Sequence, residues 1–204
     1  MMFFRKNNLF VALLATLFMV GCQSSDTDAQ SADAAADDPN KVVLTEYSDY
    51  QCPACAYYHP IVEKIKNEMG DKVEVQLRFF PLNGHRYSAL AARAAQAAKN
   101  QDKFYEMHAL LFENQQQWSQ ASNPVTAIVN FARELELDLN QFTEDLNAGE
   151  TQKIVMEQKQ EGADMGVNST PTFYLDGEEV EPLPKTYEEF KAQIEERLAN
   201  KQGS

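Results

Sequence analysis

Residues Tyr47-Ser-Asp-Tyr-Gln-Cys-Pro-Ala-Cys55 set two cysteines three positions apart directly after an apolar segment, and this arrangement indicates the architecture of the 204-residue chain. The apolar segment begins at Val42 and is typical of a short buried strand. Pro53 fits the first turn of a helix, where its missing N–H costs nothing. Apolar residues then recur at helical spacing as far as Met69. We therefore expect Cys52 at the start of a helix that follows a strand.

The residues after this helix predict a second strand and then a helical region. Apolar side chains alternate with polar ones from Val73 to Phe79, as in a strand with one apolar face. Strand, helix and strand make a βαβ unit, whose strands we expect to be parallel. Helical patterns fill residues 84–167, including an Ala-rich run from Ala89 to Ala98. We expect these helices to cover the sheet and shape a groove.

The last part of the chain returns to strands. Thr172 to Leu175 predicts one strand, Asp176-Gly177 a hairpin turn, and Val180 lies in the expected partner strand. Thr186 and Glu189 form a capping box for a final helix. The expected fold is α/β, in the order βαβ, all-helical insertion, ββα.

The spacing of Cys52 and Cys55 favours redox chemistry over a structural role. A disulfide across two intervening residues contributes little stability, because the entropy it removes from the unfolded chain grows with loop length. A structural zinc site requires four ligands, and the sequence contains no second C-x-x-C motif. A copper-binding or metal-delivery protein that uses the same two thiolates stays open, since Cu(I) favours sulfur ligands.

The N-terminal residues are typical of a targeting segment. Arg5 and Lys6 precede an apolar run of signal-peptide length that ends at Val20. The string Met19-Val-Gly-Cys22 resembles the bacterial lipobox, in which the cysteine is lipidated and becomes the mature N-terminus. We expect a signal peptide over residues 1–21 and a lipid anchor on Cys22, with an uncleaved membrane anchor as the alternative. Both interpretations place the remaining chain outside the cytoplasm.

Composition predicts how the anchor is joined to the globular part. Residues 22–40 are rich in Ser, Ala, Asp and Gln and contain no aromatic residue, which indicates a disordered acidic tether. The globular domain is expected over residues 41–204. The net charge of -13 and the lack of a basic patch in the sequence exclude a nucleic-acid partner.

The residues above resemble the DsbA-like thiol–disulfide oxidoreductases, a family of thioredoxin fold with a helical insertion. The resemblance covers roughly residues 42–198. It is carried by residues 47–55, by Pro60 in the following helix, and by Ser169-Thr-Pro171 ahead of an aromatic strand. It implies an enzyme without a cofactor or bound metal, which we expect to be a monomer.

The resemblance also implies roles at the site. Cys52 is expected to be the exposed, reactive thiolate, stabilised by the helix N-terminus, and Cys55 the deeper cysteine that resolves the mixed disulfide. Pro171 is expected in the cis form, facing the cysteines. Thr170 would offer backbone hydrogen bonds to an extended substrate peptide.

Glu46 lies six residues before Cys52, where the family has a buried carboxylate beneath the disulfide. The functional interpretation is a proton acceptor for Cys55 with a pKa raised by burial. The alternative is a strand register that points Glu46 to solvent. His59 and His108 are assigned no role.

The active-site dipeptide Pro53-Ala54 bears on the direction of electron flow. The strongly oxidising members of the family have Pro-His at this place, and Ala54 offers no imidazole to stabilise the thiolate. We expect a weaker oxidant than those members, whose potential is roughly -120 mV. Oxidation of cysteine-containing exported proteins is favoured over reduction, with a membrane or soluble partner that restores the active state. Gln23 favours the outer membrane, on its periplasmic side, in a cell that has one.

Overall fold

The computed structural model describes residue 38 and residues 40–203, in which four strands form one mixed sheet of order β2-β1-β3-β4. The central strand β1 runs parallel to β2 and antiparallel to β3, and β4 pairs antiparallel with β3. The bounds of the strands are β1 (Val42–Ser48), β2 (Val73–Phe79), β3 (Thr172–Leu175) and β4 (Glu178–Glu179).

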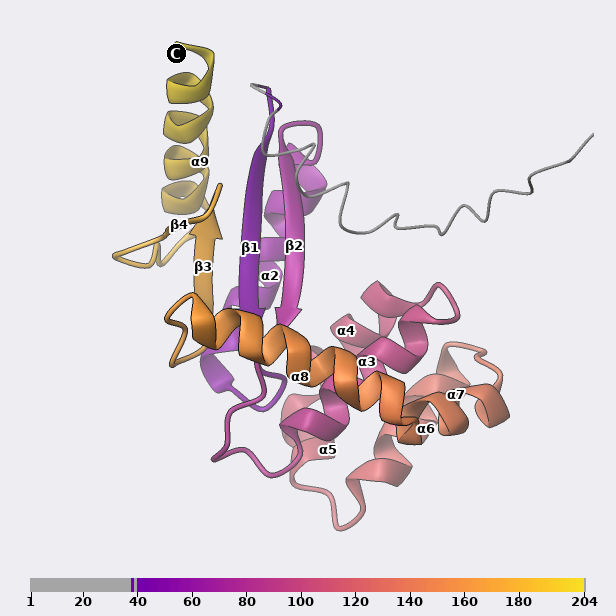
Figure 1. The fold of residues 1–204 in the computed structure, drawn as a ribbon. Helices are drawn as coiled ribbons and strands as arrows, with labels where there is room; N and C mark the ends of the chain where they lie inside the picture. Colours follow the sequence, from indigo (N-terminus) through magenta and orange to yellow (C-terminus); the bar gives the residue numbers. More distant parts are fainter. Residues whose placement is uncertain (1–37, 39, 204) are drawn as a thin grey trace, which may run out of the picture.

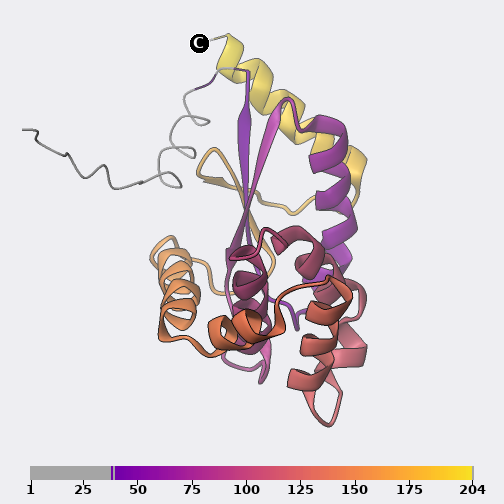
Figure 2. The same ribbon diagram turned by 90° about the vertical axis from the view of Figure 1, so that its right-hand side faces the viewer.

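Two helices cover one face of the sheet. They are α2 (Pro53–Met69), which follows β1, and α9 (Tyr187–Gln202) at the end of the chain. Both lie on the same side of the strands in Figure 2. Alternate residues of a strand point to opposite faces, so Val42 and Leu44 of β1 pack under these helices in one hydrophobic cluster.

The opposite face of the sheet packs against α8 (Gly149–Asp164), which crosses in front of the strands in Figure 1. Tyr47 of β1 points to this side and clusters there with Phe80, Val167 and Tyr174. Gly162 of α8 lies directly against the rings of Tyr47 and Phe80, so α8 packs on the sheet through this small cluster.

A helical insertion of six helices joins β2 to β3 in the described chain. Figures 1 and 2 show that its first five helices gather beyond the end of the sheet at which β1 and β2 end. The Ala-rich α3 lies at the centre of the insertion, because its small side chains let α4, α7 and α8 approach closely. Besides α8, the insertion contains α3 (Ser88–Lys99), α4 (Phe104–Glu113), α5 (Gln115–Ser119), α6 (Pro124–Glu134) and α7 (Leu139–Asn147).

The α/β thioredoxin fold expected from the sequence, βαβ and ββα around a helical insertion, is confirmed. One detail differs: β4 ends before Val180, although the N–H of Val180 still donates to the carbonyl oxygen of Phe173 at 2.9 Å. The predicted signal peptide and lipidated Cys22 lie outside the described residues, as does nearly all of the predicted tether. Among the described helices, none has the length and apolar character needed to cross a bilayer.

Candidate active site

Cys52 lies at the point where the chain turns from β1 into α2. The N–H of Cys52 donates to the carbonyl oxygen of Asp49 at 3.0 Å, and the carbonyl oxygen of Cys52 accepts from the N–H of Ala56 at 3.2 Å. Cys52 is therefore the N-cap residue, and Pro53 occupies the first helical position, as predicted. Pro53 and Ala54 are exposed, so the first turn of α2 faces solvent.

The sulfur of Cys52 is covered by the loop that precedes β3. Its thiol donates to the carbonyl oxygen of Thr170 at 3.3 Å. Only 7% of the residue is exposed, and the expectation of an exposed cysteine was therefore wrong. The sequence could not indicate this cover, because it comes from a loop 118 residues away.

Cys55 lies deeper than Cys52, as expected. It is 0% exposed, and its sulfur accepts a hydrogen bond from the backbone N–H of Asp49 at 3.5 Å. Both cysteines are thiols in the structure. They share a hydrophobic cluster with Tyr50, Phe79 and residues of the insertion, so the insertion encloses the redox pair.

The two thiols differ strongly in acidity. Hydrogen bonding from the Cys55 thiol is the largest influence that lowers the pKa of Cys52 to about 5, with further contributions from the Thr170 hydroxyl and the backbone at the start of α2. Burial, in contrast, raises the pKa of Cys55 far above its ordinary value, and the neighbouring Cys52 and Glu46 add to this. At neutral pH the pair therefore consists of a Cys52 thiolate and a Cys55 thiol.

Glu46 lies in the middle of β1, opposite Leu77 of β2 and Phe173 of β3. It is buried, so the alternative of a solvent-facing register is wrong. Burial raises the pKa of its carboxyl group to about 7, and one of its oxygens has no hydrogen-bond partner among the described residues. Such a carboxyl group exchanges protons near neutral pH.

The loop before β3 carries the two residues that the sequence assigned to substrate binding. The peptide bond between Thr170 and Pro171 is cis, as expected, and Pro171 is buried. A second cis bond, between Glu181 and Pro182, was not expected.

Asp49 organises the approach to the cysteines, and the sequence interpretation missed it. Its buried carboxylate accepts from the N–H of Gln51 and from the N–H of Leu82, both at 2.7 Å. It also bonds to the His85 ring at 2.9 Å and to the Ser88 hydroxyl. An aspartate carboxylate that accepts from the backbone N–H two residues later forms a common turn, so the bond between Asp49 and Gln51 could have been recognised in the sequence. These bonds fix the backbone that donates to Cys55.

Gln115 was also missed. Its side-chain amide in α5 donates to the carbonyl oxygens of Tyr50 and Cys52, each at 2.9 Å. It therefore ties the insertion to the residues around the nucleophile. No local signal marks a contact made across 63 residues of chain.

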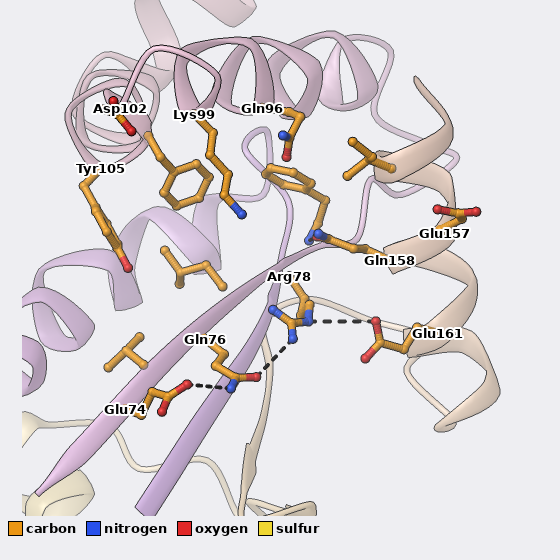
Figure 3. Close-up of a pocket in the computed structure, with 15 residues that line it drawn as sticks. Glu74, Gln76, Arg78, Gln96, Lys99, Asp102, Tyr105, Glu157, Gln158 and Glu161 are labelled. Carbon is orange, nitrogen blue, oxygen red and sulfur yellow. Dashed lines mark hydrogen bonds and ion pairs between the residues drawn. The ribbon is translucent and has the colours of Figure 1, made fainter. Parts of the chain in front are cut away.

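A surface pocket of about 950 Å³ lies apart from the cysteines, along the outer edge of β2. Figure 3 shows Glu74, Gln76 and Arg78 on this strand linked in a row that ends at Glu161 of α8. The neighbouring Gln158 accepts the N–H of Phe79 at 2.8 Å. These polar side chains cover part of the unpaired edge of the sheet. Neither cysteine of the motif lines this pocket.

The fold and the sequence match proteins of known class. A family model described as Thioredoxin matches residues 36–196. A thioredoxin-like oxidoreductase from Silicibacter pomeroyi DSS-3 is 25% identical, with a TM-score of 0.64 over 84% of this chain and 98% of that chain. Oxidised BdbD from Bacillus subtilis is also 25% identical, with a TM-score of 0.68 over 82% of this chain and 90% of that chain. The protein alpha-DsbA1 from Wolbachia pipientis has a TM-score of 0.68 at 19% identity, over 80% of this chain and 89% of that chain, which is a likeness of fold.

Similarity to curated proteins concerns one segment of much longer chains. The chain is 35% identical over 141 residues to the Na(+)/H(+) antiporter NhaA 1 of Mycobacterium sp. strain KMS. The match covers 67% of this chain and 22% of the antiporter. The chain thus spans about a fifth of the curated relatives it matches, and their transport activity is not carried over to it.

Proposed function

The chain belongs to the thioredoxin family, with the DsbA-like form of its fold, and we propose on that premise that it is a thiol–disulfide oxidoreductase acting on cysteine-containing proteins through Cys52 and Cys55. The observation that carries the proposal is the contrast between the two thiols, since the pKa of Cys52 is lowered to about 5 and that of the buried Cys55 is raised. A low-pKa sulfur is a good leaving group, and its partner is kept protonated beside it.

In the oxidising direction, a substrate thiolate attacks the sulfur of Cys52 in the Cys52–Cys55 disulfide. The bond between the two cysteine sulfurs breaks, a mixed disulfide forms, and Cys55 leaves as a thiolate that takes up a proton. A second substrate thiolate then attacks the substrate sulfur of the mixed disulfide, and Cys52 leaves as a thiolate. Two electrons pass from the substrate to the pair, and the substrate departs with a disulfide.

Glu46 is proposed to exchange the proton of Cys55. Its pKa of about 7 keeps both protonation states accessible at neutral pH. In the oxidising direction the Glu46 carboxyl group would supply the proton, directly or through one water molecule, that Cys55 takes up when it leaves. In the reducing direction the carboxylate would accept the proton from Cys55.

Thr170 and Pro171 are proposed to hold the substrate beside the nucleophile. The loop that contains them lies against the sulfur of Cys52, so a peptide that reaches this sulfur must pass along the loop. An extended peptide could be held there by backbone hydrogen bonds, as in other proteins that bind a peptide in the extended form. Pro53 and Ala54 would form the exposed opposite side of the approach.

The oxidising direction is proposed over the reducing one. Stabilising the Cys52 thiolate stabilises the reduced form of the protein, and this makes its disulfide a better oxidant. The lipobox-like segment that ends at Cys22 supports a lipid anchor in the bacterial envelope, facing the periplasm. Exported proteins would be the substrates there, and a membrane or soluble redox protein would reoxidise the pair.

Two assays on the purified chain test the proposal: reduction of insulin and oxidation of a peptide dithiol. We expect both activities in the wild type and their loss in Cys52→Ala. Cys22→Ser is the matched control, since it removes a thiol and keeps the motif. Retained activity in Cys52→Ala would contradict the proposal, and tight Cu(I) binding without turnover would favour the metal-carrying alternative. In living cells, a pair held mostly as disulfide would indicate an oxidase, and a pair held mostly as dithiol a reductase.

A further inference from the structure

A second group of chemically active side chains lies between α2 and α4. His59 and Glu63 are four residues apart on α2 and therefore share one face of that helix. His108 reaches them from α4. One ligand atom from each of the three side chains lies within 4.8 Å of the others. The proposed disulfide exchange uses none of these residues.

We propose that His59, Glu63 and His108 form a binding site for a divalent transition metal ion, with zinc as the best match. Two imidazole nitrogens and one carboxylate oxygen are ligands that Zn²⁺ accepts in proteins, with a fourth position left for water or another side chain. Ca²⁺ and Mg²⁺ require sets of oxygen ligands and do not match two histidines. The site is separate from the cysteines and contains no thiolate.

His59 provides the observation that points to a ligand. The residue is 7% exposed, and its Nδ1 atom is buried without a hydrogen-bond partner among the described residues. A buried polar atom without a partner costs free energy, so most such atoms in native proteins are satisfied. His59 lines a surface pocket of about 640 Å³ together with Glu63, and a metal ion could reach the cluster from there.

His108 is held as a metal-binding histidine commonly is. Its Nδ1 lies 2.9 Å from the hydroxyl of Tyr50, which leaves Nε2 as its ligand atom. A hydrogen bond of this kind, behind the ligand atom, fixes the orientation and the tautomer of the ring. Phe104 stacks on the ring and Phe112 meets it edge-on, so its position is well defined. Burial lowers the pKa of both histidines, and neutral imidazole is the form that binds a metal.

Glu63 is the adjustable member of the cluster. Its side chain is 31% exposed, and one carboxylate oxygen lies 3.8 Å from the ammonium group of Lys66. In a tetrahedral zinc site the ligand atoms lie about 3.4 Å apart, because each is about 2.0–2.1 Å from the ion. Ligand atoms within 4.8 Å of one another must therefore move closer when a metal ion binds, and the partly exposed Glu63 can contribute by rotating away from Lys66. Glu113 lines the same pocket and could supply the fourth ligand.

A bound ion would tie the redox helix to the insertion. His59 lies one turn beyond Cys55 on α2, and α4 belongs to the insertion that encloses the cysteines. Metal binding at this place involves no electron transfer and needs no reaction at Cys52 or Cys55. The inference therefore stands or falls independently of the proposed disulfide exchange.

The test is a titration of the full chain carrying Cys22→Ser, with Cys52 and Cys55 oxidised so that no thiolate can bind the metal. Co²⁺ is the probe, because tetrahedral coordination gives it strong visible absorption, and Zn²⁺ is then added to displace it. We expect one equivalent to bind, Zn²⁺ to abolish the absorption, and the melting temperature to rise with Zn²⁺.

Variants assign the site. His59→Gln and His108→Gln should each weaken binding by roughly tenfold or more, whereas His85→Gln should bind like the parent, since His85 lies outside the cluster. If His108→Gln does not fold, His59→Gln and Glu63→Gln decide the question, because Glu63 is partly exposed. The proposal would be overturned if the parent protein bound Co²⁺ no more tightly than His59→Gln does. It would also be overturned if Co²⁺ binding were lost only in His85→Gln.

Discussion

The sulfur of Cys52 lies 3.3 Å from the backbone carbonyl oxygen of Thr170, although 118 residues separate the two along the chain. This contact joins the two halves of the fold at the nucleophile, since Cys52 follows β1 and Thr170 precedes β3. It explains why the reactive cysteine is nearly buried. It also means that a substrate reaching Cys52 must meet this loop.

The first prediction concerns the effect of the Thr170 hydroxyl on the pKa of Cys52. The buried hydroxyl has no hydrogen-bond partner elsewhere in the described structure, so it can donate to the Cys52 thiolate and thereby contribute to the low pKa of Cys52. We expect Thr170→Val to raise the pKa of Cys52 from about 5 toward about 6, since a hydrogen bond to a charged group contributes about 1.5 kcal/mol. The ultraviolet absorbance of the thiolate, followed against pH in the reduced protein, measures this. An unchanged pKa would show that the hydroxyl does not reach the sulfur.

Glu46→Gln should change the dependence of stability on pH. The carboxyl group has a pKa near 4.5 when unfolded and near 7 when folded. Between these values the folded state binds more protons, so stability falls as pH rises, by about 3 kcal/mol in total. The glutamine of the variant cannot ionise, so the variant should be more stable than the wild type above pH 7. It should also exchange disulfides more slowly, because it cannot exchange a proton with Cys55.

Urea unfolding at pH 4.5 and at pH 8 measures the effect of Glu46→Gln on the free energy of unfolding. The proteins are oxidised, so that Cys52 and Cys55 have no thiol that titrates in this range. The exposed Glu179→Gln is the matched control, and it should keep the wild-type pH dependence. A wild-type fall in stability that persists in Glu46→Gln would show that another group causes it.

The redox potential should lie between those of thioredoxin and DsbA, about -270 and -120 mV. The pKa of about 5 for Cys52 lies between their nucleophile values of about 7 and 3.5. Ala54→His should raise the potential, because an imidazole there stabilises the thiolate, whereas Ala54→Gln should leave it near the wild-type value. Equilibration with glutathione buffers measures the redox potentials of the wild type and of both variants. A wild-type potential as high as about -120 mV would refute the role assigned to Ala54.

Gly162→Ala tests how α8 packs on the sheet. A Cβ atom at Gly162 would lie 2.8 Å from the ring of Tyr47 and 2.9 Å from that of Phe80, which is too close for either buried ring. We expect a loss of about 1–3 kcal/mol in the free energy of unfolding. Gly149→Ala in the same helix meets no atom within 4 Å and serves as the control. Equal stability of both variants would mean that α8 can shift away from Tyr47.

Local patterns were sufficient to predict the fold and the main motif. The alternation in β2, the proline after Cys52 and the Ala-rich α3 are signals that depend on neighbouring residues. The spacing of Cys52 and Cys55 identified the redox pair in the same way, whereas Glu46 was identified from the resemblance to the DsbA-like family. Their environment could not be predicted, because it depends on contacts between distant segments.

The missed residues make this plain. Gln115 holds the carbonyl oxygen of Cys52 from α5, and nothing near Gln115 in the sequence indicates it. The burial of Cys52 depends on the loop at Thr170, and the grouping of His59 with His108 depends on how α4 packs against α2. Each histidine alone resembles an ordinary core residue.

The proposed role of Cys52 can be observed by trapping the reaction intermediate. Reduced Cys55→Ser also carries Cys22→Ser, and its serine hydroxyl can replace the hydrogen bond from the Cys55 thiol that lowers the pKa of Cys52. This variant is incubated with a peptide disulfide and analysed by intact mass and peptide mapping. We expect a mixed disulfide on Cys52 that forms rapidly even at pH 6, because the pKa of this thiol is about 5. The reciprocal Cys52→Ala variant should form little adduct, since burial raises the pKa of Cys55. An adduct that forms on Cys55 as fast as on Cys52, or on neither, would contradict the account.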